Sequence, residues 1–531
     1  MEVAPYNESE AVEIGRSTAN MASYIFVGKL VSFILGFIAL VVVARILGPT
    51  SYGIYIIAVA AAGIAGSVGN FGIGTALNKF ISEYKVKRDR RSIERILSDG
   101  IAILLIAGTV LTIATFAASG AVARYSIHNI AYTYIIEVAS LSVIASLLFG
   151  AIYSGLVGFG DGTHVASVSI IGSVMQYAIS IPLVILGFGP VGPVIGLVLG
   201  QLIGFLACIY IFYAKGHLRP VMPSFKRMRK LMRFSNPLAL SNVYYIIINN
   251  MSVVILGIFV ASSIAGNFGI ASKTGFLADL IVGSIGIAIL PGFSSIIAKR
   301  GTRSKVNIFY NKALYISMTI ISPFMFFLIF LSKQVSYTAF SSSYTLAPLY
   351  IAITAVGILL GIAGGYAGTL LISDNRTKEV LKYRGRMFLI QLVAMVFLIY
   401  FLHGLGLIIL VFVLEPLLLD IFYLNRITKL YNIRLEIGKI SRVILANIIS
   451  FAIIYPIAII FGAEYLYTVI ASIAAIILVY PIVIVLIGGM SRDDTNLIRR
   501  STSTMPIVGR MMSLILDYSA LVMPKRTSGS A

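Results

Sequence analysis

Long runs of apolar residues, each about 20 residues in length, recur along the whole chain between short polar segments. A helix of about 20 residues crosses a hydrocarbon core about 30 Å thick. The runs are continuously apolar rather than alternating, which disfavours the strands of a β-barrel. The pattern predicts an all-α polytopic membrane protein with about 14 transmembrane helices. The predicted spans are residues 21–44, 52–78, 98–120, 132–157, 165–187, 190–213, 234–261, 267–297, 313–332, 345–372, 387–403, 405–424, 443–462 and 466–488.

Two pairs of spans have almost nothing between them. The fifth and sixth are joined by the segment around Gly187–Pro190, and the eleventh and twelfth by His403–Gly404. Such tight joints predict antiparallel hairpins.

Composition leaves no room for a large soluble domain. The 531 residues are 59% hydrophobic and only 11% charged, whereas a soluble protein carries about 25% charged residues. Cys208 is the only cysteine, which excludes an internal disulfide and a CxxC metal site. The polar, acidic N-terminal segment does not have the features of a cleaved signal peptide.

The net charge is +21, and the distribution of the positive charges along the chain indicates the orientation of the spans. Nearly all of the 41 lysines and arginines lie in alternate connections, above all 79–97, 214–233, 298–312, 373–386 and 425–442. Positive charge beside spans marks the cytoplasmic side, so both termini are expected in the cytoplasm and the protein in the cytoplasmic membrane. Because the charge is divided among short connections, we expect no nucleic-acid partner.

Two short motifs recur at nearly the same offset. Tyr52-Gly53-Ile54, which opens the second span, reappears 216 residues later as Phe268-Gly269-Ile270. A second match, with an offset of 213, relates Tyr153, Gly155 and Asp161 to Tyr366, Gly368 and Asp374. The matches predict two pseudo-symmetric six-span lobes and two extra C-terminal helices, as in transporters built from parallel repeats. The predicted regions are an N-terminal cytoplasmic segment (1–20), an N-lobe (21–213), a basic cytoplasmic linker (214–233), a C-lobe (234–424), two extra spans (425–488) and a cytoplasmic tail (489–531).

Two further patterns concern packing. Glycines stack every four residues in the sixth span (Gly192, Gly196, Gly200, Gly204) and in the tenth (Gly357, Gly361, Gly365), which predicts close helix–helix contact. In the tail, residues 505–523 place apolar side chains at helical spacing, which fits either an interfacial helix or a segment packed on the bundle.

The chain resembles a known family in three places. These are the segment from Gly28 to Tyr84, with its Ala44-Arg45-Ile46-Leu47-Gly48-Pro49 and Tyr52-Gly53-Ile54-Tyr55, the segment Phe234–Leu238, and the eighth span from Gly269 to Pro291. They look like the polysaccharide flippases of the MATE-like superfamily, and they also resemble the lipid-II flippases. One departure is Ser252, shortly before Leu256-Gly257 of the seventh span, where the family often has an Asp.

The resemblance implies two lobes around a central cavity and transport by alternating access. The expected substrate is a polyprenyl-phosphate- or pyrophosphate-linked oligosaccharide for a surface polysaccharide or glycoprotein, moved from the cytoplasmic to the outer leaflet. Membrane lipids and enzymes of glycan assembly or transfer are the other expected partners. The protein is not expected to be an enzyme or to hold a cofactor or metal, although a proton or sodium ion could drive transport.

A phosphate-bearing substrate requires cations within the membrane, where charges are costly and mark functional sites. Lys29 in the first span and Lys273 in the eighth are candidates to bind the phosphate or line a cavity, and Arg45 is a third candidate at the outer end of the first span. For the lysines a buried ion pair is the alternative, and Arg45 could instead reach the lipid headgroups.

Acidic and amide side chains complete the candidate site. Asp279 in the eighth span and Glu415 in the twelfth could bind a coupling ion or neutralise a buried lysine. Candidates to contact the sugar are Asn249, Asn250, Gln176 and Gln391, although hydrogen bonds between helices are the commoner use of such residues.

Two other functions fit the sequence less well. A cation-coupled MATE-type drug exporter usually has twelve spans and an acidic cavity. A membrane glycosyltransferase or polymerase usually carries a large outer loop or soluble domain.

Overall fold

The computed structural model describes residues 8–214, 221–274, 289–290, 292–297, 303–460 and 466–492, with a few positions between 494 and 518. Within these residues every regular element is a helix, which confirms the predicted all-α fold class. Eleven helical segments of the described chain are long and apolar enough to cross a membrane. The protein is therefore a multi-pass membrane protein. The number fourteen stays a prediction, because about half of the eighth predicted span lies outside the described residues.

By internal contacts the chain divides into two compact units, Met1–Gly266 and Asn267–Ala531. The predicted boundaries of the lobes, linker and tail stay predictions, and most of the tail helix at 505–523 lies outside the described residues. The principal helices of unit 1 are α1 (Glu8–Asn70), α2 (Ile73–Val86), α3 (Arg90–Ala117), α5 (Thr133–Gly158), α6 (Gly162–Ile185), α7 (Val191–Ala214) and α8 (Phe225–Phe259). The helix α9 (Ser262–Thr274) runs across the boundary, and the short α4 (Ser119–Val122) follows α3.

The helix α1 contains the first two predicted spans. Its Val27–Asn70 part has 44 residues, about twice the length that one crossing needs. Gly48 divides it, with a φ of 70° and a ψ of 173° that suit a residue without a side chain, and Pro49 follows. The second span was predicted to continue to residue 78, which is wrong: the helix ends at Asn70, and α2 begins after a left-handed Gly72.

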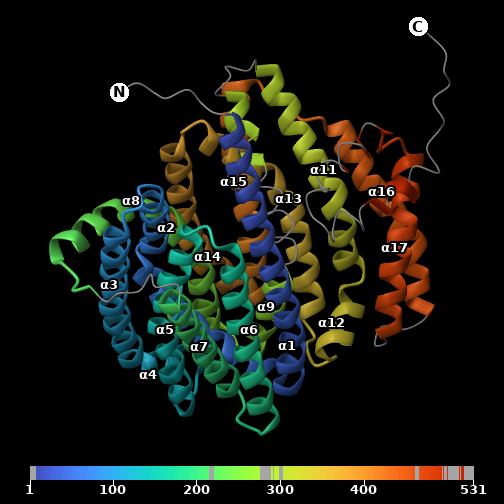
Figure 1. Ribbon diagram of the computed structural model, residues 1–531. Helices are drawn as coiled ribbons and strands as arrows, with labels where there is room; N and C mark the ends of the chain where they lie inside the picture. Colours follow the sequence, from blue (N-terminus) through green and yellow to red (C-terminus); the bar gives the residue numbers. More distant parts are fainter. Residues whose placement is uncertain are drawn as a thin grey trace. The chain divides into compact units, whose positions relative to one another are not determined.

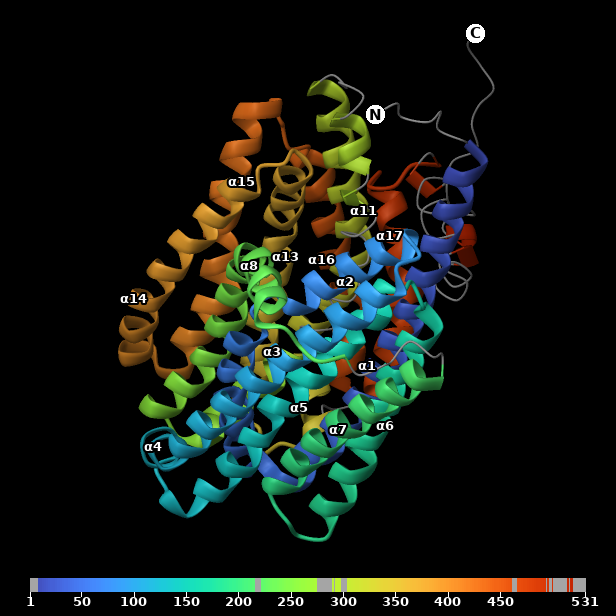
Figure 2. The same cartoon turned by 60° about the vertical axis from the view of Figure 1, so that its left-hand side comes forward.

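Within unit 1, α5 lies between α3 and α7 (Figures 1 and 2), and it contacts both. The expected hairpin between the fifth and sixth spans is confirmed, because α6 and α7 are joined by a short turn in which Gly187 and Gly189 have positive φ. The helix α8 begins at Phe225, so part of the segment expected as a basic loop is helical. Its positive charges are compatible with a helix in water.

The principal helices of unit 2 are α11 (Arg303–Phe330), α12 (Ser332–Phe340), α13 (Ala347–Ser373), α14 (Thr377–Ile409), α15 (Glu415–Tyr431), α16 (Ile437–Ile460) and α17 (Leu466–Leu486). A short π-helix, η3 (Leu410–Leu414), leads from α14 into α15. The helix α13 contacts α11 and α15, as α5 contacts α3 and α7 in unit 1. In this respect the units follow the predicted repeat.

The predicted hairpin of the eleventh and twelfth spans is present, although the bounds of α14, Thr377–Ile409, extend through the turn. A Cβ built on Gly406 would lie 2.2 Å from the carbonyl oxygen of Leu398, which a straight helix does not allow. The segments Thr377–Leu402 and Leu405–Tyr431 are accordingly two separate spans by length and hydropathy. Figure 2 shows α14 and α15 running back beside each other.

Glycines in α7 and α13 let helices approach closely. In α7, Gly196 and Gly200 face the backbone of Gln176 and Ser180 on α6, as the four-residue row predicted. In α13 the contact with η3 and α15 is made by a differently spaced row, Gly357, Gly361, Gly364 and Gly368. The predicted member Gly365 is exposed and has no atom within 4 Å of its added Cβ. The row follows the true period of 3.6 residues, which moves the contact off the four-residue line.

The equivalent glycines of the sequence repeat have equivalent neighbours. A Cβ on Gly155 of α5 would lie 3.1 Å from the ring of Phe212 on α7. A Cβ on Gly368 of α13 would lie 3.3 Å from the ring of Tyr423 on α15. In each unit, therefore, a glycine of the fourth or tenth span packs against an aromatic ring that lies two spans further along the chain.

Candidate functional site

The three predicted cations have exposed side chains. Lys29 follows Gly28, which packs against Ala166 of α6 so closely that an added Cβ would lie 2.7 Å from its Cα. Arg45 lies three residues before the break in α1, and Lys273 lies near the end of α9. Lys29 and Arg45 belong to unit 1 and Lys273 to unit 2. Their common role in binding a phosphate stays a prediction.

Two of the amide candidates in unit 1 lie at helix crossings. Gln176 is half-buried where α6 meets the glycine row of α7. The side-chain oxygen of Asn250 on α8 would lie 2.8 Å from a Cβ on Gly63 of α1. The side chain of Asn249 and the whole of Asp279 lie outside the described residues.

The best-defined polar contact among the candidates is in unit 2. The amide nitrogen Nε2 of Gln391 on α14 donates a hydrogen bond to Oε2 of Glu415 on α15, at 2.6 Å. Gln391 is 3% exposed. Because 24 residues of straight helix would separate these groups by about 36 Å, the hairpin brings them together. Two residues that the sequence placed in different roles therefore form one pair.

Glu415 lies where the π-helix η3 passes into α15. Glu415 is the first residue of α15, directly after the π-helix η3, and Pro416 follows it. Single π-helical turns often occur at functional sites because they re-aim the side chains beside them. Arg384, two turns before Gln391 on α14, interacts electrostatically with Glu415. The Glu415–Gln391 pair thus joins an acid to a neutral donor, and the cation Arg384 acts on the acid electrostatically.

A buried acid on the same helix was missed by the sequence reasoning. Asp420 on α15 is 8% exposed and faces α13, where a Cβ on Gly364 would lie 1.7 Å from its Oδ1. The hydroxyl of Tyr310 on α11 donates to the carbonyl of Ala363, next to this glycine, at 2.7 Å. Asp420 lies inside the predicted span 405–424, so the rule that selected Glu415 would also have found it.

Chemically, the Glu415–Gln391 pair is suited to exchanging a proton or a small cation. A neutral amide can hydrogen-bond the carboxylate or the carboxylic acid, since rotation of the amide offers either a donor or an acceptor. An Arg or Lys partner would favour the charged acid alone. The arrangement therefore permits a change of charge at Glu415 without breaking the contact between α14 and α15.

Three solved structures have a similar fold. The lipid II flippase MurJ in an inward closed conformation is 17% identical with a TM-score of 0.69, covering 86% of this chain and 97% of that one. An inward-facing multidrug resistance MATE family transporter of the MOP superfamily is 18% identical with a TM-score of 0.58, covering 78% and 95%. A MOP superfamily transporter from Pyrococcus furiosus is 16% identical with a TM-score of 0.55, covering 78% and 96%. The chain thus has the fold shared by MurJ and the MATE transporters.

Sequence comparison identifies the family. Residues 18–297, more than half of the chain, match the family described as "Polysaccharide biosynthesis protein", and this protein belongs to it. The matched range contains the motif segments of both α1 and α9, so the resemblance inferred from them is confirmed. No curated protein matches the sequence.

Proposed function

We propose that this protein is a flippase that moves a polyprenyl-linked oligosaccharide across the cytoplasmic membrane by alternating access. The observation that carries the proposal is the combination of family and fold. The family is one of polysaccharide biosynthesis, and the fold matches the lipid II flippase MurJ over 86% of this chain. A lipid carrier anchors the sugar in the membrane, so a protein of this family and fold is suited to move the headgroup from one leaflet to the other.

The substrate's phosphate gives the exposed cations a role. Lys29, Arg45 and Lys273 are positions in or beside the spans where an anionic headgroup can be bound. Under the expected orientation the substrate is loaded on the side that carries the basic connections. The protein would receive its cargo from enzymes that assemble the glycan there and deliver it to enzymes that transfer it on the other side.

Deletion of the gene tests the function directly. The lipid-linked oligosaccharide should accumulate facing the cytoplasm, and the surface glycan made from it should be lost. The measurement is analysis of surface glycans together with mass spectrometry of extracted lipid-linked intermediates. Unchanged glycans with altered drug tolerance would favour the drug exporter, the function named by the MATE structure with a TM-score of 0.58.

Replacing the two intramembrane lysines tests the phosphate-binding role. Lys29→Ala and Lys273→Ala should each lower transport by about tenfold or more, because a charged hydrogen bond contributes about 1.5–3 kcal/mol. The assay is flipping of NBD-labelled polyprenyl-diphosphoryl-N-acetylglucosamine in proteoliposomes. Both side chains are exposed, so protein yield should not change. Arg124→Ala, at an exposed cation between the third and fourth predicted spans, is the control and should transport normally.

A further inference from the structure

The segment that leads into α8 is attached to α3 through a buried carboxylate. The backbone N–H of Ser224 donates to Oδ1 of Asp99 at 2.9 Å. Nε of Arg227 donates to Oδ2 of Asp99 at 2.6 Å, and Nη2 of Arg227 donates to the carbonyl oxygen of Met222 at 2.9 Å. Asp99 is 1% exposed, so Arg227 compensates its charge. Together the acid and the arginine hold one N–H and one C=O of the same backbone segment.

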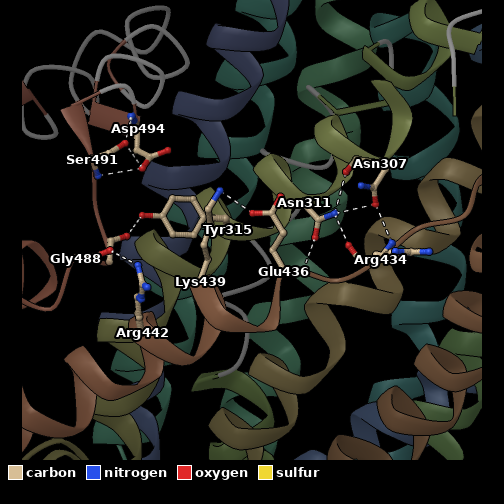
Figure 3. Close-up of polar contacts among 11 residues, drawn as sticks. Asn307, Asn311, Tyr315, Arg434, Glu436, Lys439, Arg442, Gly488, Ser491 and Asp494 are labelled. Carbon is tan, nitrogen blue, oxygen red and sulfur yellow. Dashed lines mark hydrogen bonds and ion pairs between the residues drawn. The ribbon is translucent and has the colours of Figure 1, made fainter. Parts of the chain in front are cut away.

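In unit 2 a single asparagine makes the corresponding contacts (Figure 3). Oδ1 of Asn311 on α11 accepts from the backbone N–H of Glu436 at 2.9 Å. Nδ2 of the same side chain donates to the carbonyl oxygen of Arg434 at 2.9 Å. Asn307, one turn earlier, accepts from the N–H of Arg434. These bonds hold the segment that leads into α16.

The two sets of contacts are related residue by residue. The N–H donor and its side-chain acceptor lie 125 residues apart in both units. One offset of 212 residues relates all four positions, close to the offsets of the two sequence motifs. The related residues are Asp99 with Asn311, Met222 with Arg434, Ser224 with Glu436, and Arg227 with Lys439. Because a carboxylate can only accept, Asp99 needs Arg227 as the donor that Asn311 carries in its own amide.

We propose that these contacts are two copies of one clamp, which fixes the helix following each six-helix half to the third helix of that half and stays closed during transport. The clamp joins α8 to α3 and α16 to α11. Asp99, Arg227 and Asn311 are then positioning residues for transport, because they make α8 move together with α3 and α16 together with α11. By the same equivalence α16 corresponds to α8, so α16 and α17 begin a third, truncated copy of the repeat.

Other contacts in unit 2 strengthen the attachment of the two extra helices. Nδ2 of Asn447 on α16 donates to Oγ of Ser322 on α11 at 2.8 Å. The hydroxyl of Tyr315 on α11 donates to the carbonyl of Gly489, just beyond α17, and Arg442 on α16 donates to the neighbouring carbonyl of Gly488 (Figure 3). The helices α11, α16 and α17 are therefore held together at the end where the clamp lies. If the clamp stays closed, the change between conformations takes place beyond residue 227 and not in the segment 221–227.

Converting the first clamp into the second is the sharpest test. Arg227→Ala should lower the melting temperature, and it should slow flipping of the NBD-labelled probe by about tenfold or more. The reason is that it leaves a buried carboxylate without its compensating charge. Adding Asp99→Asn to Arg227→Ala should restore both, since the new amide supplies the donor and acceptor as Asn311 does. Asp99→Ala with Arg227→Ala is the matched control and should stay defective. If Asp99→Asn with Arg227→Ala is no better than this control, the two clamps are not equivalent.

A covalent tether tests whether the clamp stays closed. The N–H of Val221 donates to Oγ of Ser98, at 3.4 Å, so cysteines at these two positions lie close enough to be oxidised together. In a Cys208→Ala background, Ser98→Cys with Val221→Cys should flip the probe equally fast before and after oxidation. Transport that stops on oxidation and returns on reduction would show that the clamp opens.

These experiments rest partly on the proposed transport function, and the two can fail separately. If the unaltered protein does not flip the probe, the proposed function fails for this substrate class. The comparison of melting temperatures still tests the clamp, because it depends on folding alone.

Discussion

Replacing Gly357 by alanine should strongly destabilise the protein. A Cβ at this position would lie 1.6 Å from the carbonyl oxygen of Phe412, an atom of the η3 backbone that no side-chain rotation can move away. The helix α13 and η3 would have to separate, and overpacking of this kind costs about 1–3 kcal/mol or more. The measurement is the melting temperature and the monodisperse fraction of the detergent-purified protein.

A control lies two turns further along the same helix. Gly365 is exposed and has no atom within 4 Å of its added Cβ, so Gly365→Ala should melt at the same temperature or higher. Alanine is favoured over glycine in a helix interior by about 1 kcal/mol, which gives the direction of any change. If Gly357→Ala melts like the unaltered protein, α13 and η3 do not pack as closely as the structure shows.

Most spans could be predicted from the sequence because lipid imposes one requirement on each of them. Every run must satisfy its backbone hydrogen bonds internally, so about 20 apolar residues give a helix with few alternatives. The predicted spans 190–213 and 466–488 accordingly match α7 and α17 to within about two residues. The hairpins also followed from the sequence, because two spans joined by two to four residues can only reverse.

Errors arose where hydrophobicity and helix formation do not coincide. Residues 71–78 remain apolar enough to extend a span, yet the backbone breaks at Gly72 with a positive φ. Residues 225–233 are too basic for a span, yet α8 includes them, because charge excludes a segment from lipid without preventing a helix. Gly365 was assigned to the wrong face because a four-residue spacing drifts around a helix with 3.6 residues per turn.

The candidate site was only partly accessible from sequence. An acid inside a span is visible in any sequence, and this selected Glu415 and should have selected Asp420. Its partner was not visible, because the Gln391 contact depends on the register of the α14–α15 hairpin. Asp99 was overlooked for a similar reason: at the end of a predicted span it reads as solvated, whereas the returning segment 221–224 buries it.

Replacing Glu415 by glutamine should abolish the response of transport to an ion gradient. We propose that this acid takes up the coupling proton or sodium ion, because its partner Gln391 is a neutral amide that can bond either charge state. Glutamine has nearly the same shape, and it retains an acceptor for Gln391, so yield and melting temperature should change little. Probe flipping in proteoliposomes is measured with no gradient, with a pH gradient and with a sodium gradient. The unaltered protein should be accelerated by one gradient, and Glu415→Gln by neither.

Two comparisons make the result specific to this residue. Glu137→Gln removes an acid near the start of the fourth predicted span, 132–157, and it should leave the response unchanged. Asp420→Asn removes the other acid of α15, which is buried and packs against the backbone of α13 at Gly364. If Asp420→Asn abolishes the response and Glu415→Gln does not, then the coupling ion binds at the α13–α15 contact, and the Glu415–Gln391 pair only holds the hairpin together.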